Sequence, residues 1–210
     1  DIFISVQLTR PGTMMINTSR LTGVDGTDTR SLSRGMIRGR RETMQLLSLL
    51  RKHFPGFQQA RIKAVAPTMG IRETRRIRGS FRLTVKDLNR GRRFSDTIGF
   101  SAYGWDLPDA KKPSVNPGHG HHQEVVPIPY RILLPQGVDN LICPGRVVSV
   151  EHPVLGPLRV QAPCMAMGEA AGQACTQVVQ NNVAFHNIAV DKLRRQLSDQ
   201  DAIVEWPVSD

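Results

Sequence analysis

The amino-acid sequence predicts a mixed α/β fold, and three observations carry this prediction. Apolar and polar residues alternate in short runs between residues 2 and 16, which is typical of β-strands. A helical period runs from residue 31 to residue 54. A short apolar segment, 140–146, then precedes an Ala- and Gly-rich helix that starts at Pro163. We therefore expect an α+β domain followed by a piece of an α/β domain.

Length and composition bound the possible functions. The chain has 210 residues, which is enough for one large or two small domains with a hydrophobic core. It carries 28 Lys and Arg against 18 Asp and Glu, so its net charge of +10 favours phosphate-bearing partners, either nucleic acid or a nucleotide cofactor. The aromatic content of 5% and the lack of zinc-finger spacing disfavour a basic nucleic-acid-binding module, which stays an alternative.

Neither a membrane span nor a disulfide framework is expected. No apolar run approaches the roughly 18 residues that a membrane helix needs, so we expect no membrane partner. The three cysteines, Cys143, Cys164 and Cys175, are odd in number and lack CxxC spacing, which favours a reducing compartment such as the cytoplasm. The compartment is otherwise not assigned. The chain begins with Asp1 and no leader, so we expect these residues to be part of a longer protein.

The first half of the chain predicts a hairpin, a long helix and further strands. The hairpin has strands of about six residues on either side of Pro11-Gly12. The helix over 31–54 takes Ser31 or Ser33 as its N-cap and stops at Pro55-Gly56. Its arginines are interpreted as a solvated polar face. Residues 61–88 are expected to form a mainly antiparallel sheet interrupted by glycines, with Thr84 capping a short helix.

The composition of the second half changes near residue 128, from loop-forming residues to apolar segments. Residues 104–127 are rich in Pro, Gly and His and predict a long loop. We therefore place the domain boundary there, with domains 1–127 and 128–210. An extended segment over 127–135 and a buried strand over 140–146 follow, and helices are expected from 163 to about 181 and from 190 to about 198.

The segment 139–175 carries the clearest chemical signal. Its predicted strand ends in a glycine turn at Gly145-Arg146, where a ligand can approach the backbone closely. The helix that follows starts with free N–H groups and the positive end of its dipole, so it favours an anion. Small residues leave this helix nearly bare, so that a flat cofactor or another element can pack against it. They are Ala166, Gly168, Ala170, Ala171, Gly172 and Ala174.

At these residues the chain resembles a family of FAD-dependent oxidoreductases in the glutathione-reductase-like class. The matching C-terminal motifs are Gly145-Arg146, Ser149 to His152, Gly156 to Arg159, and Cys164 to Gly172. The matching upstream motifs are Asn17 to Arg20, Gly23 to Asp28, Pro55 to Phe57, Gly70 to Arg76, Phe94 to Ile98, and Ile128 to Arg131. The resemblance covers nearly the whole chain, and the combination is more specific than any one motif.

The resemblance implies a cofactor, a reaction and a set of site residues. It implies that residues 1–127 form the substrate domain and that 128–210 complete a Rossmann-like FAD-binding domain. The implied reaction is hydride transfer from a small organic substrate to FAD. The implied cofactor-binding residues are Gly145, Arg146, Ala162, Pro163, Cys164, Met165 and Gly168. The implied catalytic residues are His152 and Arg159, and the implied substrate-binding residues are Arg72, Arg75 and Arg76.

Two departures from the family pattern open an alternative. The GxGxxG fingerprint that cradles the FAD pyrophosphate is absent, and Pro108 stands where the family usually has a histidine. The alternative is a piece that is inactive alone and needs a separate N-terminal FAD-binding region, or that persists as a homo-oligomer. The nucleotide fingerprint would then lie outside these residues.

Several candidate residues also have a purely structural interpretation. Arg159 could pair with Glu151 or Glu169, His152 could be a hydrogen-bonded loop residue, and the three substrate-side arginines could pair with Glu73 or Asp87. Cys164 lies where a helix dipole lowers a thiol pKa, which suggests redox chemistry, but a small packing residue is favoured. His119, His121 and His122 resemble a metal-binding tract but lack an accompanying carboxylate pair, so no metal site is expected.

Overall fold

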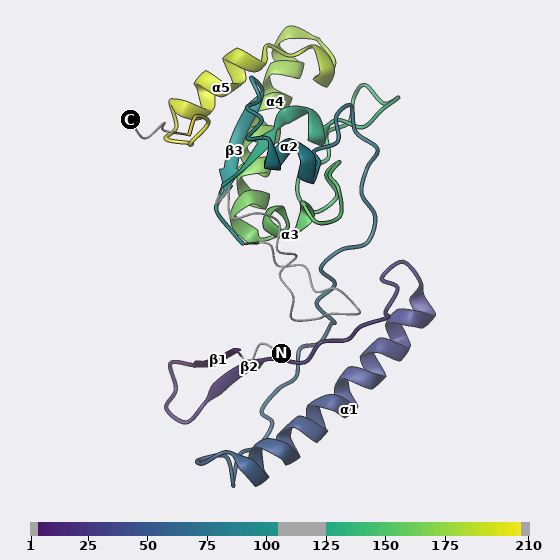
Figure 1. Cartoon of the computed structure of the whole chain (residues 1–210), viewed down its shortest axis with the longest axis vertical. Helices are drawn as coiled ribbons and strands as arrows, with labels where there is room; N and C mark the ends of the chain where they lie inside the picture. Colours follow the sequence, from purple (N-terminus) through teal and green to yellow (C-terminus); the bar gives the residue numbers. More distant parts are fainter. Residues whose placement is uncertain (1–3, 105–124, 207–210) are drawn as a thin grey trace. The chain divides into compact units, whose positions relative to one another are not determined.

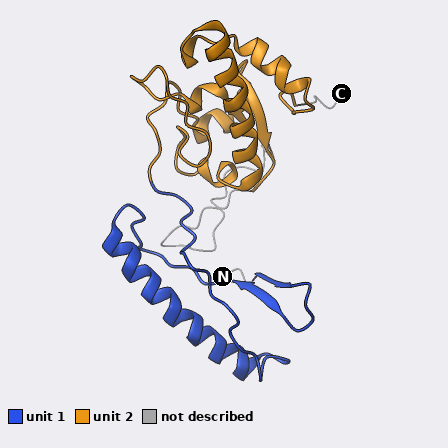
Figure 2. Ribbon diagram, turned by 180° about the vertical axis from the view of Figure 1, so that it is seen from behind, with its two compact units in different colours: residues 1–74, 108–114 blue, residues 75–107, 115–210 orange. Residues whose placement is uncertain are grey.

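The computed structural model describes residues 4–104 and 125–206, and these form two compact units (Figure 2). Among the described residues, unit 1 comprises 4–74, and unit 2 comprises 75–104 and 125–206. Residues 75–104 thus pack with the C-terminal segment, whereas the sequence suggested a boundary near residue 128. The predicted division between a substrate domain and a cofactor domain at that point stays a prediction.

Unit 1 begins with the predicted hairpin. Strands β1 (Ile4–Gln7) and β2 (Met14–Asn17) pair antiparallel, with Ile4 opposite Asn17. Each strand has four residues, fewer than the six expected, because the N–H of Leu8 already closes the loop onto the carbonyl of Thr13. Gly12 has φ +71 in this loop, a conformation that favours glycine.

Helix α1 (Thr29–His53) is the long helix that the sequence predicted. Its N-cap is Asp28, whose carboxylate accepts hydrogen bonds from the N–H groups of Arg30 and Ser31. The predicted caps were therefore wrong, because Asp28 lies one turn earlier and offers a stronger acceptor than either serine. The helix ends at Phe54, just before the predicted stop.

Unit 2 has a small sheet covered by helices (Figure 1). Strands β3 (Thr97–Ser101) and β4 (Val126–Pro129) pair antiparallel, and the 3-10 helix η1 (Tyr130–Leu133) follows β4 directly. Helix α4 (Gln161–Asn181) packs against β3, and η2 (Phe185–Asn187) and α5 (Val190–Ser198) pack against α4. The buried core includes Ile98, Ile128, Leu155, Met167 and Leu193. The mixed α/β fold class is confirmed.

Two predicted strand regions are irregular instead. Residues 61–78 form no strand, and the sheet expected over 61–88 is reduced to single bridges, Gly79–Pro135 and Leu83–Val150. The strand predicted over 140–146 is also wrong, since the described backbone there has no sheet partner. The N–H of Cys143 donates to the carbonyl of Leu133. Because Leu133 ends the 3-10 helix η1, that helix offers this segment a single carbonyl and not the edge of a strand.

The short helix expected after Thr84 is confirmed. Helix α2 (Val85–Asn89) begins with a capping box, in which Thr84 accepts from the N–H of Asp87 and the Asp87 carboxylate accepts from the N–H of Thr84. The N–H of Val85 also donates to the Glu151 carboxylate at 2.8 Å. Among the described residues, no helix is both long and apolar enough to cross a bilayer.

Candidate functional site

The glycine turn and the first turn of α4 meet, as the sequence predicted. Gly145 has φ +89, where a side chain would be strained, and a Cβ built on it would lie 3.9 Å from the Sγ of Cys164. Arg146 is also close enough to Cys164 to act on its thiol electrostatically. The turn therefore delivers an exposed arginine and an open backbone to the start of the helix.

The N-terminus of α4 is not capped by a side chain. Its N-cap residue, Val160, has an apolar side chain that makes no capping hydrogen bond. Gln161 and Ala162 are exposed, Pro163 is buried, and Met165 is 73% exposed. The first turn of this 21-residue helix has no acidic side chain of its own, so it presents a positive dipole end and the N–H groups of Gln161 and Ala162. Pro163 has no N–H, and the N–H of Cys164 donates to the carbonyl of Val160.

The outer face of α4 is bare at Gly168 and Gly172, whereas Ala170, Ala171 and Ala174 of the predicted small residues are buried. A Cβ built on Gly168 or on Gly172 would meet no atom within 4 Å, and both glycines are exposed. The opposite face is buried against the core through Met167, Ala170 and Ala174. A planar group could therefore approach the backbone of α4 at Gly168 and Gly172.

Cys164 behaves as a packing residue. It packs against the hydrophobic core, and its Sγ lies 3.7 Å from the carbonyl oxygen of Leu158. Burial raises the pKa of the Cys164 thiol, and the nearby Arg146 only partly opposes this rise. The thiol is therefore protonated at neutral pH, which is the opposite of what a reactive redox cysteine requires.

The predicted substrate arginines divide between the two units. Arg72 belongs to unit 1, whereas Arg75 and Arg76 begin unit 2. The N–H of Ile77 donates to the carbonyl of Val147 at 2.7 Å, so the segment that carries Arg75 and Arg76 runs beside the Gly145 turn. Two of the three arginines are thus brought to the neighbourhood of Arg146 by backbone pairing.

His152 and Arg159 flank the short helix α3 (Leu155–Leu158). His152 is exposed, and its carbonyl accepts from the N–H of Leu155 at 3.2 Å. Arg159 is only 9% exposed, and its N–H donates to the carbonyl of Leu155 at the end of α3. Arg159 is therefore buried two residues before the start of α4, whereas His152 is accessible.

Some predicted features lie outside the described residues. These are Pro108 and the histidines His119, His121 and His122. Within residues 4–104 and 125–206, no cluster of three or more His, Cys, Asp or Glu side chains is arranged to hold a metal ion.

An ion pair that was not predicted organises the other side of the unit 2 core. The carboxylate of the buried Asp96 accepts from Nε, Nη2 and the backbone N–H of Arg131, at 2.8, 3.0 and 3.1 Å. Its hydrogen bonds to Asp96 raise the pKa of Arg131, which also lies over the ring of Phe81 at 5.0 Å. The two residues lie in the matched segments 94–98 and 128–131, and this was the only signal that could have paired them.

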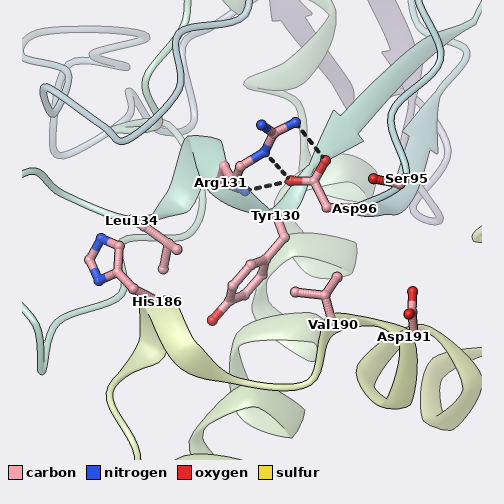
Figure 3. Close-up of a pocket in the computed structure, with 8 residues that line it drawn as sticks. All are labelled: Ser95, Asp96, Tyr130, Arg131, Leu134, His186, Val190 and Asp191. Atoms are coloured by element: carbon pink, nitrogen blue, oxygen red, sulfur yellow. Dashed lines mark hydrogen bonds and ion pairs between the residues drawn. The ribbon is translucent and has the colours of Figure 1, made fainter.

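Asp96 and Arg131 line a pocket of about 330 Å³ on unit 2 (Figure 3). Tyr130 lies across its floor and donates its hydroxyl to the carbonyl of Phe185 at 3.1 Å. Burial raises the pKa of Tyr130, so this hydroxyl stays protonated. His186, on the other side, is 3.1 Å from the hydroxyl of Ser80. Asp96 and Arg131 neutralise each other in this pocket. We therefore interpret the pair as a structural contact that joins the start of β3 to η1.

The geometry defines a class of protein. A mixed α/β unit that joins an uncapped helix end to a Gly-Arg turn is suited to hold a flat, anionic nucleotide cofactor. A model of the FAD-dependent oxidoreductase family matches residues 3–197, so the chain belongs to this family of flavoproteins, whose cofactor is FAD. Comparisons with curated proteins and with solved structures found no match.

The residues present fit one end of FAD. The Gly145 turn and the N-terminus of α4 together offer an open backbone, an arginine and uncapped N–H groups. Such groups suit the polar edge of a flavin ring or its phosphates, and the bare face around Gly168 leaves room for a ring.

Proposed function

We propose that this chain forms the flavin-facing part of an FAD-dependent oxidoreductase of the glutathione-reductase-like class, which transfers a hydride from an organic substrate. The observation that carries the proposal is the uncapped N-terminus of α4 in contact with the Gly145 turn. A protein that used α4 only for packing would gain stability from a capping side chain at this end, and Val160 provides none.

Each predicted cofactor residue has a place in this proposal. Gly145 and Arg146 would approach the ribityl or phosphate groups, with Arg146 as the countercharge. Ala162, Pro163, Cys164 and Met165 lie at the start of α4, where the N–H groups of Gln161 and Ala162 would face the pyrimidine edge of the ring. Gly168 lies one turn further and would leave space for the ring. Bound FAD would supply the two-electron acceptor.

The substrate side of the proposal rests on cationic residues near the same turn. The backbone pairing of Ile77 with Val147 brings Arg75 and Arg76 close to this turn, which supports a role for them in binding a carboxylate on the substrate. His152 is exposed and is the candidate for proton transfer. Arg159 is buried, so it would act by holding the floor of the site, or by presenting one edge of its guanidinium to the substrate. Arg72 belongs to unit 1, and its predicted role in substrate binding stays a prediction.

The test replaces Met165, which is 73% exposed near the start of α4. In Met165→Glu, a carboxylate competes for the N–H groups that FAD would use, while an acid at a helix N-terminus preserves the helix. We expect the dissociation constant for FAD to rise by about tenfold or more, since one lost charge-assisted contact is worth roughly 1.4 kcal/mol or more. FAD binding is measured by flavin fluorescence and by the absorbance of the bound flavin.

Two controls make this test specific. Met165→Gln keeps the size of the side chain without the charge, and Val179→Glu places the same charge at an 80% exposed position near the other end of α4. Both should bind FAD as the unchanged protein does. Equal binding by Met165→Glu would contradict the proposal.

The alternative, a piece that is inactive without a separate FAD-binding region, predicts a different titration. The chain alone would then bind FAD weakly, and binding would appear only when a polypeptide that carries a GxGxxG fingerprint is added. The Met165→Glu comparison is then made in that mixture. The mixture distinguishes the two explanations for weak binding. If only the FAD-binding region is missing, Met165→Glu still weakens FAD binding in the mixture; if the proposed site is wrong, the substitution has no effect there.

A further inference from the structure

Unit 1 carries most of the net positive charge of the protein. Residues 1–74 contain 12 Lys and Arg against 5 Asp and Glu, which is +7 of the net charge of +10. The proposed flavin site lies in unit 2, so it does not account for this charge. Unit 1 also buries little, since Gly35 and Leu50 are the buried residues of α1. Its outer surface is therefore basic and unusually apolar at once.

Helix α1 arranges these two properties on one face. Ile37 and Met44 are seven residues apart, so they point in nearly the same direction, and they are 54% and 58% exposed. At 100° per residue, Arg40 lies on one side of this pair, and Arg30, Arg34 and Arg41 lie on the other. The exposed face thus has an apolar centre with arginines along both margins.

The opposite side of α1 is occupied by its own unit. Cβ atoms built on Gly35 and Gly39 would come within 3.0 Å of Met69 and of Leu21, so these glycines let nearby chain pack closely. Arg38, on the flank of the helix about 100° from Ile37, donates to the carbonyl of Thr22. The helix is therefore held from behind, and the face with Ile37 and Met44 remains exposed.

The chemistry of this face selects among possible partners. A second copy of the chain would bring two strongly positive surfaces together, which is unfavourable. Nucleic acid would satisfy the arginines but would leave Ile37 and Met44 without a role. An anionic lipid surface satisfies both, because phosphates attract the arginines while apolar side chains enter the boundary of the acyl region.

We propose that α1 docks on the surface of an anionic lipid bilayer, with Ile37 and Met44 inserted and the arginines on either side facing lipid phosphates. The hairpin also favours a lipid surface, because five more of its apolar residues are between 43% and 48% exposed. These are Ile4, Val6, Leu8, Met14 and Met15. Attachment of this kind lies in the membrane interface and needs no spanning helix.

The test measures how the full chain partitions onto vesicles of phosphatidylcholine with and without phosphatidylserine. Binding should require phosphatidylserine and weaken as salt is added. Arg34→Glu with Arg41→Glu should reduce the partition coefficient by more than about tenfold, since each basic residue contributes to the attraction. Ile37→Gln with Met44→Gln keeps the charge and the helix propensity and should reduce it severalfold.

The matched control reverses two charges elsewhere. Lys192→Glu with Arg195→Glu changes the net charge equally on exposed positions of α5 and should leave partitioning nearly unchanged. Circular dichroism verifies that each variant keeps its helices. The proposal is overturned if the chain ignores phosphatidylserine, or if the control loses as much binding as the α1 pair. It is also overturned if the Gln pair binds vesicles normally, and tight single-stranded RNA binding in parallel would then assign the face to nucleic acid.

Discussion

Individual glycines have opposite roles in unit 2. Gly79 is buried, and a Cβ built on it would lie 2.6 Å from the Cβ of Ser149 and 3.2 Å from the carbonyl oxygen of Leu134. This close approach allows the segment before α2 to pack against the segment 145–150 that follows the site turn. Gly168 is on the open face of α4, where a Cβ would meet nothing within 4 Å. One glycine is therefore required by packing, and the other keeps a surface bare.

The same substitution at these two positions should have effects of opposite sign on stability. Gly79→Ala forces Ser149 or the backbone to move and should lower the free energy of unfolding by about 1–3 kcal/mol. Gly168→Ala adds a methyl group to an exposed helix interior and should raise it by about 0.5–1 kcal/mol. Urea unfolding of the two variants provides the comparison. If Gly79→Ala were as stable as the unchanged chain, the close packing of these segments would be refuted.

At the scale of elements, α2 depends on its capping box. Burial disfavours the charge of Asp87, but hydrogen bonds from Thr84 and Arg92 outweigh this effect, and the pKa of Asp87 falls below its ordinary value. The ion pair between Arg92 and Asp87 has an N–O distance of 2.8 Å. The ionised carboxylate therefore stabilises the folded state.

This lowered pKa predicts a pH dependence. Because the folded pKa lies below the unfolded one, the stabilisation is fully present above the unfolded value of about 3.9 and is lost as the pH falls through the folded value. Asp87→Asn should cost about 1 kcal/mol at pH 7 and should lose less stability on acidification than the unchanged chain. Urea unfolding as a function of pH measures both effects. Asp139→Asn, at an exposed loop position, is the control, and an equal change there would argue against the capping box.

At the scale of the whole molecule, the two units differ in how much they bury. Unit 2 contains nearly all of the buried hydrophobic residues, from Leu83 to Val204, whereas unit 1 contributes Leu50 alone to that set. A long helix and a hairpin of two four-residue strands with little core are marginal by themselves, because ordering their backbone is not offset by burial. Unit 1 should therefore open more readily than unit 2.

Hydrogen exchange followed by mass spectrometry tests this difference. Amides of α4 and β3 should exchange only through global opening, and amides of α1 should exchange by local opening at a lower free energy. Adding anionic vesicles should slow exchange in α1 if the proposed docking orders it. Equal protection of α1 and α4 in solution would show that unit 1 has a stability that its buried surface does not explain.

Much of the secondary structure and part of the candidate site could be predicted because they depend on nearby residues. The hairpin, helix α1, the α2 cap and helices α4 and α5 each arise from periodicity, turn residues or a capping side chain within a few positions. The meeting of the Gly145 turn with α4 was also predictable, through the family resemblance. The difference in burial between the exposed His152 and the buried Arg159 could not be predicted, since both follow the same local pattern of loop residues.

The sequence by itself determined the mixed α/β class, the bare helix with its open N-terminus, the excess of positive charge and the membership in an FAD-dependent family. Only the tertiary structure decided that 140–146 is irregular, that residues 75–104 pack with the C-terminal segment, and that Asp96 binds Arg131. The physical reason is distance along the chain. Local signals set helices and turns, whereas a strand, a buried charge or a packed glycine depends on partners that are dozens of residues away and meet only when the chain has folded.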